Sequence, residues 1–97
     1  MTYRVLIGIK ASKFLSTLTD NSQRRIKNKC KVLVEDPYPG QGGDKKLIER
    51  GRKSAYRLHV ARSYTVFYRI NENDKEVKIL KITTIEQAHK LYGRLDL

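Results

Sequence analysis

Two histidines, one arginine and one tyrosine of this 97-residue chain have types and spacings that could perform chemistry on an anionic substrate. His59 follows Arg57 by two positions, so on an extended strand both side chains point to the same face. His89 precedes Tyr92 by three positions, which places the two one turn apart on one side of a helix. Histidine exchanges protons near neutral pH, and arginine stabilises developing negative charge. The sequence therefore offers candidate acid, base and cation positions.

The charge balance indicates a polyanionic partner, of which nucleic acid is the commonest. The chain has 21 Lys and Arg residues against 10 Asp and Glu residues, a formal net charge of +11 and a pI near 10.0. Several of these cations follow one another closely between residues 45 and 53, and such a run is typical of a segment that binds phosphate groups. We expect nucleic-acid contacts from Lys45, Lys46, Arg50, Arg52 and Lys53.

Other features of the composition exclude whole classes of protein. The single cysteine, Cys30, excludes an internal disulfide framework, and two histidines do not supply a ligand set for a structural zinc. Hydrophobic residues make up 39% of the chain, enough for a core, which argues against a largely disordered basic tail. The apolar run before Lys10 is too short for a signal peptide or a membrane span. We expect one small, soluble, cytoplasmic domain without a metal or cofactor, with Cys30 buried.

Hydrophobic periodicity in the first half of the chain predicts a strand followed by a helical hairpin. Apolar residues alternate over 3–9, which is the period of a strand with one buried face. Helical spacing then appears over 11–18 and again over 26–34, which predicts two antiparallel helices joined by a tight turn. Pro, Gly and clustered cations interrupt the pattern over 36–54, so this segment is expected to be a long basic loop.

The second half of the chain predicts an antiparallel meander and a terminal helix. Alternation over 56–60 and 64–70 predicts two strands, and the apolar stretch 77–82 predicts a third. Residues 84–97 form a C-terminal segment that is compatible with a short helix. We expect an α+β fold in which the first strand joins the sheet beside the last, because a lone strand is not stable. The buried face of the meander should include Tyr56, Tyr64 and Tyr68.

Segments along nearly the whole chain share an order, spacing and basicity that occur together in one family. These are Tyr3-Arg4-Val5, the hairpin from Ala11 to Val34, Lys45 to Leu47, Ala55 to Leu58, Tyr64 to Ile70, Val77 to Ile82, and His89 to Tyr92. Together they resemble the RelE/ParE superfamily of toxins from type II toxin–antitoxin pairs. This resemblance implies a four-stranded, mainly antiparallel sheet that cradles the two helices, with an active groove between the other sheet face and the C-terminal segment. RelE-like members cut mRNA in the ribosomal A site, ParE-like members act on DNA gyrase, and a cognate antitoxin inhibits both.

The resemblance also implies roles for the candidate residues. RelE-like toxins carry basic residues at the strand positions of Arg57 and His59, which implies that both lie in the catalytic groove. Their C-terminal region supplies a catalytic Arg or His and a tyrosine that stacks on a base, and His89 and Tyr92 match these. Cutting RNA without a metal needs a base for the ribose 2′-OH, cations for the transition state and an acid for the leaving 5′-oxygen. Further phosphate contacts are expected from Arg62, Arg69 and Lys90.

One strand position departs from the family's pattern. Ribonuclease members commonly carry an Arg just after a Gly-Tyr or similar pair, where it grips the scissile phosphate, whereas here Thr65 follows Ser63-Tyr64. The two histidines favour a RelE-like, metal-independent and ribosome-dependent mRNA endoribonuclease that inhibits translation. The missing Arg favours a ParE-like gyrase inhibitor without nuclease activity, or an RNA-binding domain without catalysis. For the toxins, the expected partner is an acidic, RelB-like antitoxin that offsets part of the +11 charge.

Overall fold

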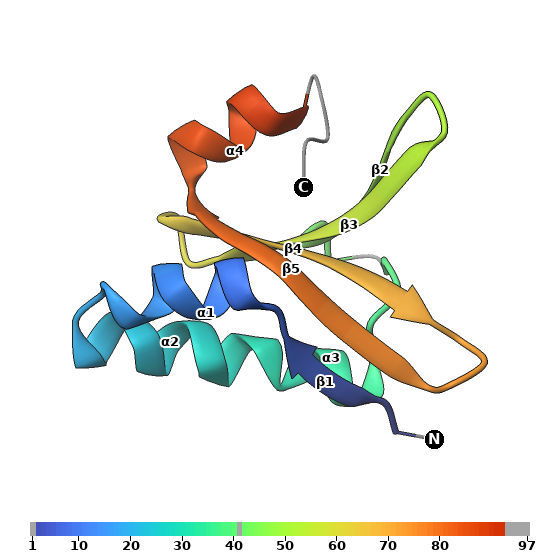
Figure 1. Cartoon of the computed structure of the whole chain (residues 1–97), viewed down its shortest axis with the longest axis horizontal. Helices are drawn as coiled ribbons and strands as arrows, with labels where there is room; N and C mark the ends of the chain where they lie inside the picture. The colour runs from blue at the N-terminus through green and yellow to red at the C-terminus, as the bar shows by residue number, and fades with distance from the viewer. Residues whose placement is uncertain (1, 41, 93–97) are drawn as a thin grey trace.

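The computed structural model describes residues 2–40 and 42–92, apart from the side chains of residues 50, 89, 91 and 92. In chain order the elements are β1 (Arg4–Ile7), α1 (Ile9–Ser16), α2 (Asp20–Cys30), α3 (Val32–Glu35), β2 (Lys45–Arg50), β3 (Lys53–Val60), β4 (Tyr64–Asn71), β5 (Glu76–Thr84) and α4 (Ile85–Tyr92). The α1–α2 hairpin lies on one side of the sheet and α4 on the other (Figure 1). This confirms the predicted α+β class. None of the described helices has the length and apolar character needed to cross a membrane.

The sheet has the strand order β1-β5-β4-β3-β2 within the described residues. β1 runs parallel to β5, as expected for a first strand beside the last, and the other neighbours are antiparallel. At the turn into α1, Gly8 lies so close to β5 that a Cβ atom would be 2.9 Å from the carbonyl oxygen of Ile79. A side chain at this position would therefore separate β1 from β5.

The five strands exceed the expected four because the segment 36–54 is not one long loop. β2 lies within it and forms a hairpin with β3, and Gly51 takes a positive φ of 62° in the turn. β2 is an edge strand, and edge strands are commonly rich in charged side chains. Because β2 is rich in Lys, Glu and Arg, it lacks the clear apolar alternation by which strands are recognised in a sequence.

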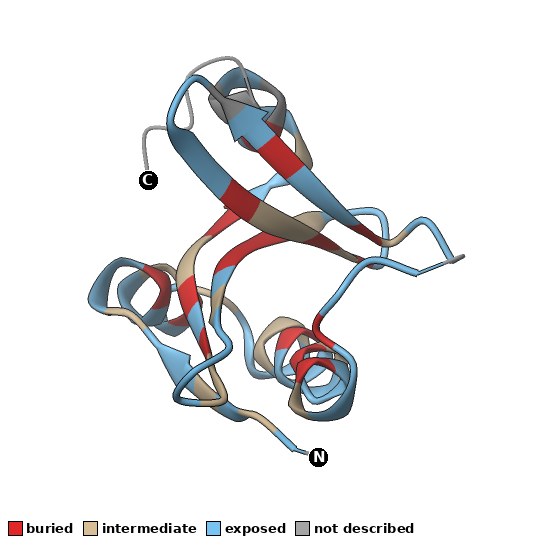
Figure 2. Cartoon of the chain, turned by 90° about the vertical axis from the view of Figure 1, so that its right-hand side faces the viewer, coloured by how far each residue is buried: buried red, intermediate tan, exposed pale blue. Residues whose placement is uncertain are grey.

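The main core fills the space between the sheet and the α1–α2 hairpin. Thr19 begins α2 by accepting a hydrogen bond from the Ser22 amide at 3.2 Å, which caps the helix. The largest core side chain, Tyr68, is fully buried, and the Tyr56 ring stacks on it with 5.5 Å between centroids. Tyr64 packs against the same cluster, so the three tyrosines lie where the alternation predicts. Figure 2 shows the buried residues concentrated on the strands and on the helix sides that face them.

A second, smaller cluster lies on the opposite face, beneath α4. It consists of Ile48, Ala55, Phe67 and Ala88, which come from β2, β3, β4 and α4. Phe67 and Ala88 are fully buried. The helix predicted for the C-terminal segment, α4, is therefore packed on the sheet. It partly covers the face that the α1–α2 hairpin does not cover.

Glu72, in the β4–β5 turn, ties three separate segments together. Its carboxylate accepts hydrogen bonds from the hydroxyls of Tyr3 at 2.8 Å and Tyr38 at 2.5 Å, and it forms an ion pair with Lys75. These donors lower the pKa of Glu72 to about 2, with the Lys75 ammonium contributing most. The N-terminal segment, the segment after α3 and the β4–β5 turn are thus linked through one surface carboxylate.

Candidate functional site

Arg57 and His59 lie on the face of β3 that points away from the helical hairpin. Ala55, which shares their alternation, packs in the cluster beneath α4. The intervening Leu58 and Val60 are buried in the main core on the other face. Arg57 and His59 are themselves half-buried. The face that the resemblance assigns to the catalytic groove therefore carries both residues, and α4 lies over part of it.

A row of side chains crosses the sheet at the level of Arg57. Arg57 pairs in register with Lys46 of β2 on one side and with Phe67 of β4 on the other, and Phe67 pairs with Lys81 of β5. Because neighbouring strands lie about 4.8 Å apart, the backbones at Arg57 and Lys81 are about 10 Å apart. Arg57 and Lys81 thus lie on either side of the fully buried Phe67 in this row.

Lys81 is a candidate that sequence reasoning missed. β5 contains a bulge. Phe67 of β4 pairs with Lys81, whereas the next residue, Tyr68, pairs with Ile79, so Leu80 has no partner in the register. Counting by two from Ile79 therefore places Lys81 on the helix side, whereas the register places it beside Phe67 on the α4 side. The Leu80-Lys81 dipeptide between two core isoleucines is the one local signal of this bulge.

A second row contains His59, Thr65 of β4 and Thr83 of β5, which are paired in register. His59 Nδ1 lies 3.3 Å from Thr65 Oγ1, and Thr65 is fully buried. The backbone amide of His59 donates to the Asp44 carbonyl at 2.9 Å. The position at which the family commonly has a phosphate-binding Arg therefore holds a hydroxyl against the His59 ring.

Lys45 does not belong to this face, which corrects its expected role in nucleic-acid binding. It pairs in register with Leu58, so its side chain lies on the opposite side of the sheet and only 6% of the residue is exposed. Its ammonium forms an ion pair with the Asp36 carboxylate at 2.9 Å and donates to the Asp36 carbonyl at 2.6 Å. Lys45 therefore anchors the segment after α3, whereas Lys46, on the other face, is exposed.

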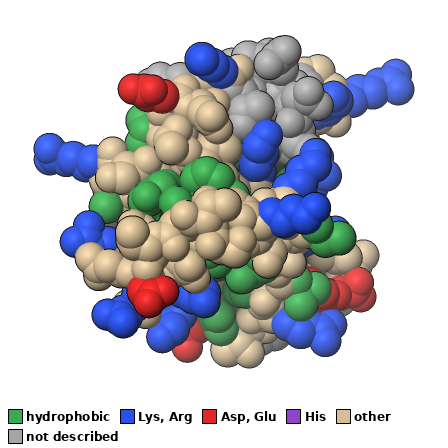
Figure 3. Space-filling view, turned by 60° about the vertical axis from the view of Figure 1, so that its left-hand side comes forward, with side chains coloured by type: hydrophobic (Ala, Val, Ile, Leu, Met, Phe, Trp, Pro, Cys, Tyr) green, Lys and Arg blue, Asp and Glu red, His purple; other side chains and the backbone are tan. Residues whose placement is uncertain are grey.

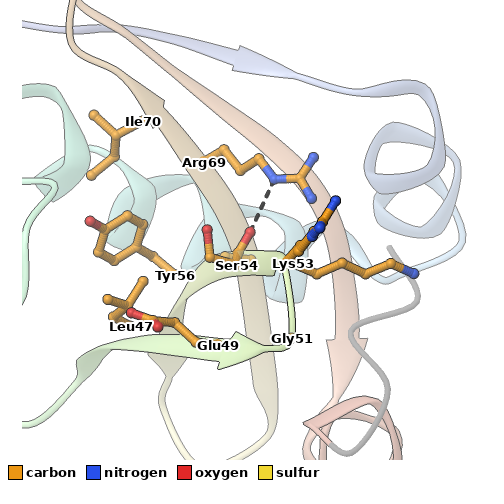
Figure 4. A pocket seen from close by; sticks show the side chains of 10 residues that line it. Leu47, Glu49, Gly51, Lys53, Ser54, Tyr56, Arg69 and Ile70 are labelled. Atoms are coloured by element: carbon orange, nitrogen blue, oxygen red, sulfur yellow. Dashed lines mark hydrogen bonds between the residues drawn. The ribbon is translucent and has the colours of Figure 1, made fainter.

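The β2–β3 hairpin gathers a second group of predicted cations. Arg52, Lys53 and Arg69 line an open depression of about 500 Å³ at this end of the sheet, and all three are exposed. The Arg69 Nε donates to the Ser54 carbonyl at 3.1 Å, and Figure 4 shows Arg69 and Lys53 next to Ser54. The side chain of Arg50, whose backbone pairs with Lys53, lies outside the described residues.

The remaining predicted residues lie toward the opposite end of the sheet or on α4. Arg62 is exposed in the β3–β4 turn, next to the point where the Ser63 carbonyl accepts from the first amide of α4 at 3.1 Å. Lys90 is exposed on α4. His89 and Tyr92 have their backbone in α4, but their side chains lie outside the described residues. In the view of Figure 3, Lys and Arg side chains project from many points and outnumber the acidic ones.

Neither a reactive thiol nor a metal cluster is found among the described residues. Burial raises the pKa of the Cys30 thiol to about 11, so it is protonated and poorly nucleophilic at neutral pH. Residues 2–40 and 42–92 contain no group of three or more His, Cys, Asp or Glu side chains that could hold a metal ion. The chemistry available at the described face is that of an imidazole among cations.

Comparison with known proteins identifies the family. The sequence matches the family of the ParE toxin of the type II toxin–antitoxin system parDE over residues 10–88. The chain is similar to the archaeal RelE of the RelE–RelB complex from Pyrococcus horikoshii OT3, at 33% identity and a TM-score of 0.71 over 87% of this chain and 96% of that one.

Two further structures support the fold. The isolated RelE toxin of Escherichia coli is 17% identical, with a TM-score of 0.67 over 91% of this chain and 96% of that one. YafQ of E. coli is 12% identical, with a TM-score of 0.68 over 89% of this chain and 97% of that one. No curated protein sequence gives a significant match. On the family match and the archaeal relative, the chain belongs to the RelE/ParE superfamily of toxins of type II toxin–antitoxin systems.

Proposed function

We propose that this toxin is a cytoplasmic, ribosome-dependent endoribonuclease that cuts mRNA. The observation that carries the proposal is the α4-side face of the sheet, where Arg57 and His59 stand side by side and half-buried. Lys46 and Lys81 lie in the same row as Arg57, next to the row of His59, so cations from three strands share this face with one imidazole. Such a face supplies both the charge and the proton-transfer group that cleavage of a phosphodiester requires.

The reaction follows from the chemistry of RNA. A base removes the proton from a ribose 2′-OH, and the 2′-oxygen attacks the adjacent phosphorus. The bond from phosphorus to the 5′-oxygen breaks, and an acid protonates that oxygen, which leaves a 2′,3′-cyclic phosphate and a 5′-hydroxyl. His59 serves one of the two proton transfers, and the Arg57 guanidinium stabilises the extra negative charge on the phosphate oxygens.

The second proton-transfer group and the base-stacking group are assigned to α4. Ala88 is packed on Phe67, and Phe67 pairs in register with Arg57, so the backbone of α4 lies close to the Arg57 row. His89 directly follows Ala88, and Tyr92 is one turn further along. We assign the second proton transfer to His89 and stacking on a base to Tyr92, as the resemblance to RelE-like toxins implies.

Single-turnover cleavage of mRNA on programmed ribosomes tests this function. The variants His59→Ala and Arg57→Ala should each slow cleavage by about 10²- to 10⁴-fold, the range for a lost proton-transfer or charge-stabilising group. Arg24→Ala is the matched control, because it removes one exposed cation from α2 on the far side of the sheet. Circular dichroism and thermal melts establish that each variant is folded. Wild-type rates for both site variants would refute the assigned site.

Gyrase inhibition is the competing function, because the family match is to a ParE toxin and Thr65 replaces the phosphate-binding Arg. A supercoiling assay with purified gyrase, run on the same protein, separates the two. Ribosomal cleavage without gyrase inhibition supports the nuclease. Gyrase inhibition without cleavage of mRNA, on or off the ribosome, would overturn it. Binding of RNA with neither effect would favour a non-catalytic RNA-binding domain.

An acidic antitoxin is the proposed protein partner, in line with the archaeal relative in a RelE–RelB complex. An apolar groove of about 180 Å³ lies between β1, β5 and α2, where Ile7 is 46% exposed and Lys27 and Lys31 form the rim. An amphipathic acidic segment fits this combination. Coexpression with a small acidic protein encoded beside the toxin gene should give a salt-stable complex that Ile7→Glu disrupts. Val32→Glu, at an exposed valine on α3 outside the groove, is the control.

A further inference from the structure

We propose that Arg69 and Lys78 together bind a phosphate of the substrate RNA strand, next to the bond that is cut. The two cations stand directly opposite each other on β4 and β5. They extend the face that carries Arg57 and His59 by one row of side chains. This inference rests on the proposed nuclease function, which it deepens by assigning a contact to the substrate outside the reacting centre.

Strand register places this pair next to the Arg57 row. Arg69 follows Phe67 by two positions on β4, so both side chains point to the α4 side of the sheet. Phe67 in turn pairs with Arg57. Two residues of a strand span about 6.8 Å, which is therefore the distance between the two rows. An RNA strand bound at Arg57 thus has Arg69 and Lys78 within reach on the same face.

The pairing of two cations is unfavourable in the chain by itself. Like charges directly opposite each other destabilise a sheet, because the two side chains start about 5 Å apart. Among the residues that the structure describes, neither Arg69 nor Lys78 forms an ion pair that would relieve the repulsion. The Arg69 Nε donates to the Ser54 carbonyl at 3.1 Å, which engages only the inner nitrogen of the guanidinium. An anionic ligand would supply the missing negative charge.

Both cations line an open depression of about 470 Å³. Arg69 bonds toward β3, whereas Lys78 extends toward the end of β1, where a Cβ atom on Gly8 would lie 3.8 Å from the Lys78 Cε. Leu6, which is 40% exposed, lines the same depression. A phosphate between the two cations would offset their repulsion, and the apolar surface of Leu6 is available to the attached sugar or base.

The carboxylates that line this depression have partners of their own. Glu76 forms an ion pair with Arg4 at 3.3 Å, and Glu72 forms one with Lys75 and accepts hydrogen bonds from two tyrosine hydroxyls. Their negative charges are therefore offset by neighbours. Within the described part of the chain, the opposed cations of β4 and β5 are the charges of the depression that have no counterpart. Charge complementarity thus favours a polyanion, and continuity with the Arg57 row favours the substrate strand.

Binding of an RNA that cannot be cut tests this contact without catalysis. The probe is a short single-stranded RNA with methylated 2′-hydroxyls, titrated against the full-length chain at several salt concentrations. Lys78→Gln should lower the salt slope, and the double variant with Arg69→Gln should lower it by about 0.7, the value for one phosphate of a single strand. Lys13→Gln is the matched control, because it removes an exposed lysine from α1 on the other side of the sheet. An unchanged slope in Lys78→Gln would overturn the proposal.

Folding stability gives a second readout, with the sign opposite to that of a structural cation. Lys78→Gln removes the repulsion from Arg69, so the midpoint of urea unfolding should rise at low salt. The rise should shrink at 1 M salt, where charges are screened over about 3 Å. Arg69→Gln loses the bond to Ser54 together with the repulsion, so for that variant only binding is informative. A midpoint of Lys78→Gln at or below that of wild type would contradict the uncompensated repulsion.

Kinetics on programmed ribosomes keep this inference distinct from the function on which it rests. Lys78→Gln should raise the toxin concentration at half-maximal single-turnover rate by about 2- to 5-fold, the range for one exposed ion pair, whereas Arg57→Ala lowers the maximal rate itself. If the wild type does not cleave, the nuclease function fails, and binding of the uncleavable RNA still decides whether this pair holds phosphate.

Two further arms identify the occupant of the surface. Lys78→Gln should bind ribosomes without mRNA as tightly as wild type, and weaker binding there would assign the contact to ribosomal RNA and overturn the substrate assignment. The complex with a coexpressed acidic protein should also be unaffected. Loss of that complex with unchanged RNA binding would assign the surface to an acidic segment of the antitoxin instead.

Discussion

Truncating Lys45 should destabilise the protein, whereas truncating its neighbour Lys46 should weaken nucleic-acid binding. The two lysines are adjacent in β2 and point to opposite faces of the sheet. The Lys45 side chain is only 5% exposed, and Lys46 is exposed. A single pair of substitutions therefore separates a structural cation from a binding cation of identical chemistry.

The expected magnitude follows from the buried part of Lys45. Lys45→Ala removes three buried methylene groups, each contributing about 0.8 kcal/mol, so the loss of burial costs about 2.4 kcal/mol. The bonds from the ammonium to Asp36 contribute about 1.5–3 kcal/mol, but the ammonium also gave up its hydration, and these two effects roughly cancel. A loss near 2.4 kcal/mol lowers the melting temperature by about 10–20 °C in a domain of this size. Lys45→Met retains the stem and should remain within about 1 kcal/mol of wild type.

Urea unfolding monitored by circular dichroism measures these differences as shifts in the midpoint at constant slope. Lys46→Ala should leave the midpoint within the range of surface substitutions, about 0.5 kcal/mol. Its effect should appear in ribosome or RNA binding, where removing one phosphate contact reduces the salt slope by about 0.7–0.9. The reasoning is refuted if Lys46→Ala destabilises as much as Lys45→Ala, or if folded Lys45→Met loses the same salt dependence as Lys46→Ala.

Three further outcomes are expected. Glu72 has a pKa of about 2 in the folded chain against 4.5 ordinarily, so the unfolded chain takes up the proton first as the pH falls. Its stabilising contribution, complete above about pH 4.5, should be lost between about pH 4.5 and pH 2, and acid titration of Glu72→Gln should lack this component. Cys30, buried and with a raised pKa, should react with a thiol reagent at pH 8 only at the rate of unfolding, so rapid labelling of the native protein would contradict its burial. Arg69→Ala should lower the salt slope of RNA binding without shifting the unfolding midpoint, since its side chain is exposed, and an unchanged slope would exclude the hairpin depression from the interface.

Local periodicity was enough to predict the elements that place Arg57 and His59. In β3, apolar Leu58 and Val60 alternate with polar residues. Successive side chains of a strand point to opposite faces, so the apolar and the polar residues lie on different faces independently of the rest of the fold. The helical hairpin was predictable for the same reason, because α1 and α2 carry apolar residues at helical spacing. Fold class and the composition of the candidate face therefore depended on neighbours only a few residues apart.

The strand β2 and the role of Lys45 could not be predicted in this way. β2 is rich in charged residues, and it becomes a strand because β3 supplies the hydrogen-bonding partners along its edge. Which of two adjacent lysines is buried depends on the layer that covers each face. For Lys45 that layer includes Asp36, whose carbonyl and carboxylate meet its ammonium.

The contacts that refine the site arise from pairing between strands that only folding brings into register. The β5 bulge turns Lys81 toward the α4 side, and the pairing of β3 with β4 sets Thr65 against His59. From the sequence alone, Thr65 was notable only because it occupies the position at which an arginine was expected. The sequence by itself determined which side chains share a strand face and how much charge they carry. Only the tertiary structure decided which side chains meet, because strand register and layer packing are set by interactions between residues distant in the chain.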